Sequence, residues 1–150
     1  MKERTLVIVK PDAMAQGSRV LAQILAEYLR WSDVYDDPPH IIGLRYFEQL
    51  PEETAHALYQ EHKGKPYYEM LVNFMRSGPV VVLVLEDDNI IHFVRELNGA
   101  TNPEKAGLGT IRERFGTKGS GFTGQQNAVH ASDSPESAKR EIAIFFPSLQ

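Results

Sequence analysis

The sequence predicts a domain in which strands and helices alternate, in the order β-α-β-α-α-β-α-β-α. Short runs of β-branched apolar residues stand apart from longer segments whose apolar residues recur at helical spacing. Stretches rich in Pro, Gly and Asp separate the two kinds of segment. The chain has 150 residues and shows no internal repeat, low-complexity tract or linker. We therefore assign residues 1–150 to a single domain, which is a typical domain length.

The first half of the chain opens with a strand over residues 5–9, which a Lys-Pro-Asp turn stops. Because this strand is apolar on both faces, we expect it at the centre of the sheet and covered by helices. The spacing of the apolar side chains predicts a helix over residues 19–30. The Asp-rich and Pro-rich residues 31–39 predict a long surface loop. A second strand follows over residues 40–47, with alternate apolar side chains on one face.

Two helices and a strongly apolar strand are predicted for the middle of the chain. One helix begins near Pro51 and runs to about residue 59, with two glutamates beside its positive end. The next carries apolar side chains at helical spacing from Tyr67 to Met75. A Ser-Gly-Pro turn then leads into a strand over residues 80–85, which is apolar throughout.

The last part of the chain alternates between clear and weak signals. Residues 87–89 are predicted to cap a helix over residues 90–98. Residues 100–127 are rich in Gly and polar residues and have few apolar positions. A short strand is predicted over residues 127–130. Capping side chains and a Pro then start a final helix, from Ser132 to about Ile142.

This order of elements is compatible with two folds. Two β-α-β halves fit a ferredoxin-like α+β fold (βαββαβ), with a four-stranded antiparallel sheet and helices on one face. A flavodoxin-like parallel sheet is the alternative. The spacing of the elements alone does not decide between them.

Composition excludes several classes of protein. Lys and Arg number 16 and Asp and Glu 20, a net charge of −4 that argues against nucleic acid as the partner. The absence of Cys excludes disulfides, thiolate metal sites and cysteine nucleophiles. The apolar stretch near the start is too short for a secretory signal, and no run reaches the roughly 18 apolar residues of a membrane span. We expect a cytoplasmic protein with no membrane partner.

Most nucleotide and catalytic motifs are absent. The chain has no G-x-x-x-x-G-K-[ST], no G-x-G-x-x-G after a strand, no H-E-x-x-H and no G-x-S-x-G. The four glycines between residues 116 and 124, taken alone, indicate a flexible loop rather than a phosphate cradle.

One of the five histidines, His130, stands where a nucleophile could act. It ends a short apolar stretch just before a helix start, and a helix N-terminus favours an anion. A neutral imidazole is a competent nucleophile near pH 7, and Ser132, Asp133 and Glu141 are candidates for orienting it. Histidines before a capped helix are often only structural, so the residues alone leave this role open. The others are expected at the surface or at its boundary: His40, His56, His62 and His92.

Cationic side chains gather around the polar segment of this acidic chain: Arg95, Lys105, Arg112, Arg114 and Lys118. Any one of them fits a solvated surface, but several around one loop favour a phosphorylated ligand, which Arg binds well. Lys10 directly follows a buried strand, and strand ends are common positions for a site. For Tyr59, Tyr67 and Tyr68, aromatic packing and base stacking are equally compatible with the sequence.

Four ordered segments together resemble the nucleoside diphosphate kinase family. They are residues 3–14 (ERTLVIVKPDAM), 65–86 (KPYYEMLVNFMRSGPVVVLVLE), 95–116 (RELNGATNPEKAGLGTIRERFG) and 127–146 (NAVHASDSPESAKREIAIFF), and they span nearly the whole chain. The resemblance implies the ferredoxin-like antiparallel sheet. It also implies a ping-pong reaction that maintains the pools of nucleoside triphosphates. ATP phosphorylates a histidine, ADP leaves, and another nucleoside diphosphate takes the phosphoryl group.

The resemblance also implies roles for individual residues. The implied catalytic residues are His130 as the nucleophile, Ser132 and Glu141 beside its imidazole, and Tyr59 near the transferring group. The implied nucleotide-binding residues are Lys10 for phosphates and sugar, Asn127 for the sugar, Arg95, Thr101 and Arg112 for the phosphates, and Tyr67 for the base, where the family usually has Phe.

Magnesium is the implied cofactor, held through the nucleotide phosphates rather than by dedicated protein ligands. The lack of a P-loop is then no objection, because phosphoryl transfer relies on positioning and on neutralising charge. The implied partners are ATP, nucleoside diphosphates and further copies of the chain, as a tetramer or hexamer. Two other functions stay open. One is a non-catalytic nucleotide-binding sensor or scaffold on the same fold, and the other is nucleic-acid binding through Arg114 and Lys118, which the net charge disfavours.

The chain departs from the family pattern in several places. Ala131 stands where Gly is common, although a small side chain should be tolerated there. Residues 31–39 and 116–126 form longer segments than in many relatives. The second segment is expected beside the nucleotide site, so the residue that covers the outer face of the base is left open.

Overall fold

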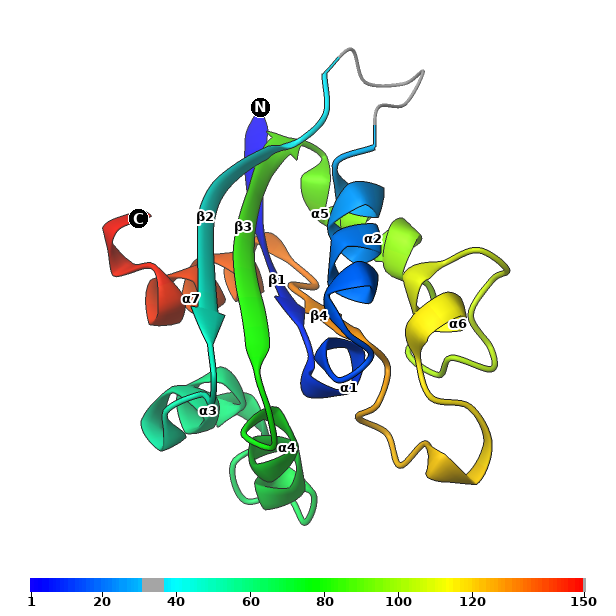
Figure 1. Cartoon of the computed structure of the whole chain (residues 1–150). Coiled ribbons are helices and arrows are strands. Elements are labelled where there is room, and N and C mark those ends of the chain that lie inside the picture. The colour runs from blue at the N-terminus through cyan, green and yellow to red at the C-terminus, as the bar shows by residue number, and fades with distance from the viewer. Residues whose placement is uncertain (31–36, 150) are drawn as a thin grey trace.

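A four-stranded antiparallel sheet forms the centre of the computed structural model, which describes residues 1–30 and 37–149 (Figure 1). Its strands are β1 (Lys2–Val9), β2 (His40–Phe47), β3 (Val80–Asp88) and β4 (Val129–Ala131). They lie in the order β2-β3-β1-β4, and every neighbouring pair is antiparallel. This arrangement confirms the predicted ferredoxin-like sheet over the parallel alternative.

The two central strands are covered on both faces. The side chains of Leu6 to Val9 on β1 and of Val80 to Leu85 on β3 are buried throughout. A strand that is apolar on both faces needs packing on both, which is why the sequence predicts a central position. The central position is confirmed. The expected placement of helices on one face only was wrong, because it left the second apolar face without a cover.

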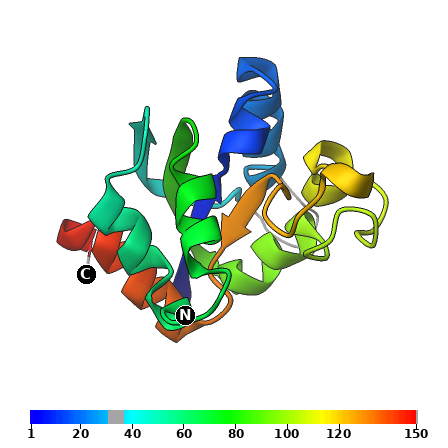
Figure 2. The same cartoon turned by 90° about the horizontal axis from the view of Figure 1, so that it is seen from below.

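The helices that flank the sheet are α1 (Pro11–Met14), α2 (Ser18–Tyr28), α3 (Glu52–Leu58), α4 (Tyr68–Met75), α5 (Ile90–Asn98), α6 (Ile111–Phe115) and α7 (Pro135–Phe145). Short 3₁₀ turns lie at Gln60–His62, Gly119–Gly121 and Pro147–Leu149. Figure 2 shows α2 and α7 on opposite sides of the sheet.

The strand register explains which helix covers which face. Register pairs Arg45 with Val82 and Val82 with Ile8, so these side chains share one face. Arg45 donates to the carbonyl of Phe145, which places the end of α7 over this face. Glu3 points to the other face, because it is an odd number of residues from Ile8. Its carboxylate accepts the first-turn N–H of Ile91 on α5, and α2 joins α5 there.

Several element boundaries differ from the predicted ones. The Lys-Pro-Asp turn after β1 is itself the start of a short helix, α1, because Pro11 at the first helical position is already shaped for a helix. Helix α6 lies in the polar segment and buries only Ile111, so it leaves no apolar periodicity to detect. Helix α7 continues to Phe145, past the predicted end at residue 142.

The charged end of β3 also differs from the prediction. Asp87 and Asp88 belong to the strand, because Asp87 pairs across the sheet with the ammonium of Lys2 at 2.6 Å. Only Asn89 caps α5. It does so with a left-handed backbone (φ 55°) and without a side-chain hydrogen bond.

Strand β2 lies at the edge of the sheet and exposes apolar side chains. The side chains of Leu44 and Tyr46 are 51% and 57% exposed. They lie on the face of the sheet opposite to α7, because Arg45 between them faces α7. Of the predicted surface loop over residues 31–39, residues 31–36 lie outside the described part of the chain, and Pro39 is buried. Among the helices of the described residues, none has the length and apolar character needed to cross a membrane.

Candidate active site

His130 lies on β4, where its neighbours hold the imidazole in one orientation. Its Nε2 is 3.1 Å from Oε1 of Glu141, and the other oxygen of that carboxylate accepts the hydroxyl of Ser132 at 2.6 Å. Ser132 is itself anchored to β1, because its Oγ accepts the N–H of Leu6 and its own N–H donates to the Leu6 carbonyl. The three side chains form a chain of hydrogen bonds that starts on the central sheet and ends at the imidazole.

The charge of Glu141 decides the tautomer of this histidine. Burial alone would raise the pKa of the Glu141 carboxyl, but the hydrogen bond and charge of His130, together with Ser132 and Arg140, lower it below the ordinary value. An ionised carboxylate only accepts hydrogen bonds, so Nε2 carries the proton that it receives. In the neutral ring, Nδ1 is then left with a free lone pair.

A cavity of about 140 Å³ opens in front of the imidazole. Its polar lining consists of Tyr59, Glu61, His62, His130, Asp133, Ser137, Arg140 and Glu141. Burial, with the charge of Glu141, raises the pKa of the Tyr59 phenol, so this hydroxyl stays protonated and can donate. Arg140 donates to the carbonyls of Ala57 and Leu58 and thereby joins the end of α3 to α7.

An aromatic series leads from this cavity toward solvent. The ring of His62 lies 6.3 Å from that of Tyr59 and 5.5 Å from that of Tyr67. The Tyr67 hydroxyl is 3.3 Å from Nδ1 of His62, and Tyr67 is 40% exposed at the start of α4. Tyr67 is therefore tied to the His130 cavity through His62. The sequence placed His62 among the surface histidines because the charged turn around it gives no sign of these contacts.

A second, cationic cavity of about 200 Å³ shares Ala131 with the first. Its lining is Arg95, Asn98, Gly99, Ala100, Thr101, Arg112 and Ala131. Arg112 is held by the carbonyls of Gly99 (3.0 Å) and Val129 (2.9 Å). Burial and the charge of Arg95 lower its pKa, and its Nε is buried with no hydrogen-bond partner among the described residues. The guanidinium groups of Arg95 and Arg112 give this cavity the positive charge of a phosphate site.

Lys10 and Asn127 form the third part of the site. The Lys10 ammonium donates to Oδ1 of Asn127 at 2.9 Å and to the carbonyl of Gln125, and it lies 5.3 Å from the ring centre of Phe74. Asn127 in turn donates to the carbonyl of Thr101 at 3.0 Å. Burial lowers the pKa of Lys10 to about 8.

The backbone just before His130 is strained. Ala128 is buried and has a φ of 73°, a conformation that L-residues other than Gly adopt at a cost. Its N–H donates to the carboxylate of Asp12 and its carbonyl accepts the N–H of Lys10, both at 2.9 Å. Asp12 thus helps to hold the turn that delivers His130. From sequence, Asp12 was expected only to help stop β1, because its partner Ala128 is 116 residues away.

The structure gathers the expected site residues into one region, with exceptions at its edge. Asp133 lines the cavity but makes no hydrogen bond to His130 in the described structure; its carboxylate pKa is lowered by Ser137 and Ser134. Of the predicted cationic cluster, only Arg95 and Arg112 line the phosphate-like cavity. Arg114 pairs instead with Glu27, and Lys118 with Glu113.

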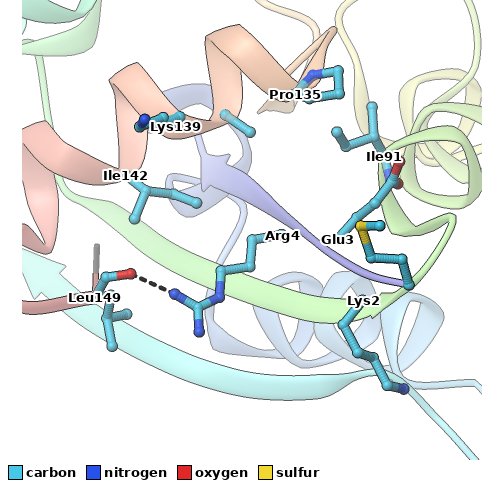
Figure 3. Close-up of a pocket in the computed structure, with 10 residues that line it drawn as sticks. Lys2, Glu3, Arg4, Ile91, Pro135, Lys139, Ile142 and Leu149 are labelled. Carbon is cyan, nitrogen blue, oxygen red and sulfur yellow. Dashed lines mark hydrogen bonds between the residues drawn. The ribbon is translucent and has the colours of Figure 1, made fainter.

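A larger cavity of about 460 Å³ lies apart from His130. Figure 3 shows Pro135, Lys139 and Ile142 of α7 on one side of it and Arg4 and Leu149 on another. Arg4 donates to the carbonyl of Leu149 across its floor. The lining is mostly apolar and includes no histidine, so this cavity offers no imidazole nucleophile.

The acidic and histidine side chains do not form a metal cage of their own. Within residues 1–30 and 37–149, no group of three or more His, Asp or Glu side chains could hold a metal ion. The charged groups of the cationic cavity are instead Arg95 and Arg112, which are both positive. A cation in this site would have to arrive with ligands of its own, such as phosphate oxygens.

Comparisons with known proteins agree with this arrangement. A family model described as "Nucleoside diphosphate kinase" matches residues 3–150. A nucleoside diphosphate kinase of Streptomyces griseus is 44% identical over 149 residues, covering 99% of each chain. One of Clostridium perfringens is 40% identical over 147 residues, covering 98% of this chain and 93% of the relative. A crystal structure of the Aquifex aeolicus nucleoside diphosphate kinase superposes with a TM-score of 0.80 at 41% identity, covering 99% of this chain and 98% of the other.

Proposed function

Since the chain belongs to the nucleoside diphosphate kinase family and is an enzyme of this kind, we propose that it transfers the terminal phosphoryl group of ATP to nucleoside diphosphates through a phosphohistidine at His130. The observation that carries the proposal is the hydrogen bond between Nε2 of His130 and Glu141. It leaves Nδ1 as the nucleophilic nitrogen. Each cycle produces one nucleoside or deoxynucleoside triphosphate, so the enzyme would maintain the pools of these nucleotides.

The reaction divides into two half-reactions. In the first, the lone pair of Nδ1 forms a bond to the γ-phosphorus of ATP, and the bond to the bridging oxygen breaks, so ADP leaves with that electron pair. The ring then carries positive charge, which the Glu141 carboxylate at Nε2 balances. In the second, a terminal oxygen of another nucleoside diphosphate attacks the same phosphorus. The N–P bond breaks, and neutral His130 returns.

The cations of the site supply the electrostatic part of catalysis. Arg95, Thr101 and Arg112 line the cationic cavity and would hold the phosphate chain. Lys10 would bind phosphate and sugar oxygens beside Asn127. Tyr59 lines the cavity of His130, and its hydroxyl would donate to the transferring group. Because charge spreads over the oxygens in the transition state, fixed donors of this kind matter more than a strong base.

As a kinase of this family, the enzyme needs a divalent cation, which we propose is Mg²⁺. The donor set fits a cation that is held by nucleotide phosphates and water, because the site offers positive side chains and no carboxylate cage. Bound in this way, Mg²⁺ would neutralise phosphate charge. Tyr67 would stack on the base; stacking without base-edge hydrogen bonds explains a broad choice of nucleotide.

We also propose that the enzyme is a homo-oligomer, a tetramer or hexamer, in the cytoplasm, where its nucleotide substrates are. The exposed apolar side chains of β2 support association, because an edge strand with such side chains is a natural place for a second copy to pack.

Labelling with γ-³²P-ATP and magnesium, followed by a GDP chase, tests the phosphohistidine. We expect acid-labile, alkali-stable label that moves to GTP and that is absent in His130→Ala. His92→Ala is the matched control, because His92 also pairs with a glutamate, Glu96 at 3.2 Å, but on the exposed face of α5. Label in folded His130→Ala would refute the assignment of the nucleophile. ATP binding without any label in the unaltered protein would favour a non-catalytic sensor.

A further inference from the structure

Lys10 is held by the end of the long segment over residues 116–126. An ammonium group has three N–H donors. In Lys10 two of them are used, one by the carbonyl of Gln125 and one by Oδ1 of Asn127. One donor is therefore left for the nucleotide. The segment contacts the lysine through its backbone, so no side-chain motif in the sequence signals the contact.

The segment is braced so that the Gln125 carbonyl stays in place. The Thr123 hydroxyl donates to Oε1 of Gln125 at 2.9 Å, and the Thr123 N–H donates to the side chain of Gln126 at 2.8 Å. The N–H of Thr117 closes the segment by donating to the Gln126 carbonyl at 2.8 Å. Gln125 is only 5% exposed although its neighbours Thr123 and Gly124 are exposed. A buried residue in an otherwise exposed loop indicates that this end of the loop is docked.

The surroundings of Lys10 show why an added acceptor matters. Burial and the positive charge of Arg112 disfavour the ammonium form, and the carboxylate of Asp12 favours it. Phe74 contributes only the face of its ring. A carbonyl oxygen that accepts from the ammonium stabilises its charged form and fixes its direction.

We propose that the segment over residues 116–126 is a positioning element for the nucleotide, and that it acts through the Gln125 carbonyl on Lys10. The segment holds the ammonium charged and aimed, so it sets how well Lys10 binds phosphate and sugar oxygens without touching them itself. This inference rests on the proposed function, because it assigns a partner to one of the nucleotide-binding residues. Nothing in it depends on which residue is phosphorylated.

Gly124→Ala tests the inference with a matched control in the same segment. Gly124 has a φ of 106°, and a Cβ there would meet no heavy atom within 4 Å, so alanine moves the adjoining Gln125 by backbone strain and not by a clash. Gly119→Ala is the control, because Gly119 also has a positive φ (73°) and open space but lies at the far end of the segment. We expect kcat/KM to fall about tenfold in Gly124→Ala, as for one lost charge-assisted hydrogen bond, and less than twofold in Gly119→Ala.

Two further measurements separate positioning from a general structural effect. In a Lys10→Met background, Gly124→Ala should cause no further loss, because the segment acts through the lysine. The alkaline limb of the pH profile of kcat/KM should move to lower pH in Gly124→Ala, since the ammonium loses an acceptor while still facing Arg112 and Asp12. If Gly124→Ala does not fold, Thr123→Val, which removes the hydroxyl that braces Gln125, must show the same two effects.

The outcomes distinguish this inference from the proposed function. His130 labelling in the unaltered protein tests the function alone. Equal kcat/KM in Gly124→Ala and Gly119→Ala, with labelling intact, would overturn the role of the segment and leave the phosphohistidine standing. Additive losses in the Lys10→Met background would overturn it as well.

Discussion

At the scale of single residues, the site depends on a few side chains whose protonation the surrounding structure decides. Glu141 is 4% exposed and still ionised, because the imidazole of His130 and the hydroxyl of Ser132 both donate to it. This carboxylate is the reason that the free lone pair of the neutral imidazole lies on Nδ1. Its charge, as well as its shape, should therefore matter for the reaction.

Replacing Glu141 by Gln removes the charge and keeps the size of the side chain. We expect the rate of His130 phosphorylation to fall roughly 10²-fold, because a neutral amide neither enforces the tautomer nor balances the charged ring. Single-turnover labelling with ATP measures this rate. Glu96→Gln, in the surface pair with His92, is the control and should leave the rate unchanged. A Glu141→Gln variant as fast as the parent would show that the tautomer is set by other means.

Lys10 gives the site a dependence on pH whose sign follows from its pKa. Burial lowers that pKa from 10.5 to about 8 in the folded protein, so between these values the unfolded chain binds more protons. Stability should therefore rise with pH across this window, and below about pH 8 the cost of burying the ammonium is fully present.

Nucleotide binding should show the opposite trend. Phosphate favours the ammonium form, so ADP binding above pH 8 requires uptake of a proton, and affinity should fall as pH rises. Calorimetry at pH 9 in two buffers of different ionisation enthalpy measures the uptake. We expect a clear uptake in the unaltered protein and a reduced one in Lys10→Met. Equal uptake in both proteins would assign the proton to another group.

Sequence reasoning found residues that carry local signals and missed those that act over distance. The residues themselves made His130, Ser132 and Glu141 candidates, because they stand beside or within a helix with a recognisable start. The family resemblance added Thr101 and Asn127 to the nucleotide-binding set. His62, Asp12 and Arg140 were not expected in the site. Arg140 reaches Ala57 across 83 positions of sequence, and no local pattern encodes such a contact.

At the scale of elements, apolar pattern predicted the sheet and the longer helices. Strands β1 and β3 were predictable because their runs are continuous, and α2 and α4 because their apolar side chains recur. Helices α1 and α6 were not predicted, because they have only a few residues and bury few of them. Both lie beside the site, because Lys10 immediately precedes α1 and Arg112 belongs to α6.

The junction between α5 and α6 shows how tightly these elements support the cationic cavity. Gly99 ends α5 with a φ of 81°, and a Cβ there would lie 2.6 Å from Oγ1 of Thr110, the N-cap of α6. We expect Gly99→Ala to lower the free energy of unfolding by about 2–4 kcal/mol, from strain plus overlap. It should also weaken ADP binding, because the Gly99 carbonyl holds Arg112.

Gly109→Ala separates these two causes. Gly109 has nearly the same φ (86°), but a Cβ there meets nothing within 4 Å. Strain alone should cost about 1 kcal/mol and leave ADP binding intact. Urea unfolding and ADP titration of both variants provide the comparison. If Gly99→Ala and Gly109→Ala lower the free energy of unfolding equally, the overlap between the new Cβ and Thr110 contributes nothing to the loss of stability.

At the scale of the whole molecule, the uncovered edge of the sheet is the feature that calls for a partner. Strand β2 has one neighbour, β3, and on the face away from α7 its apolar side chains meet solvent. An edge of this kind either is blunted by charge or pairs with another chain. The side chains of Leu44 and Tyr46 fit the second case.

A charged side chain on strand β2 should dissociate the proposed homo-oligomer. We expect Leu44→Glu to shift sedimentation from an oligomer to smaller species, because burying a carboxylate between apolar surfaces is unfavourable. Leu108→Glu is the control, since Leu108 is 95% exposed on the loop before α6 and should not change the assembly. An unaltered oligomer in Leu44→Glu would locate the contact elsewhere on the molecule.

The pairing of the first strand with the last has a consequence for folding during synthesis. Among the described strands, β4 pairs with β1 alone, and His130 lies opposite Ile8. His130 therefore takes its place in the sheet only after 122 further residues have been made. Glu141 follows later still. On the ribosome, the apolar strand β1 therefore lacks its β4 partner along one edge through most of translation. Exposed apolar surface of this kind is what chaperones bind. The site around His130 can therefore form only late in synthesis, close to the release of the finished chain.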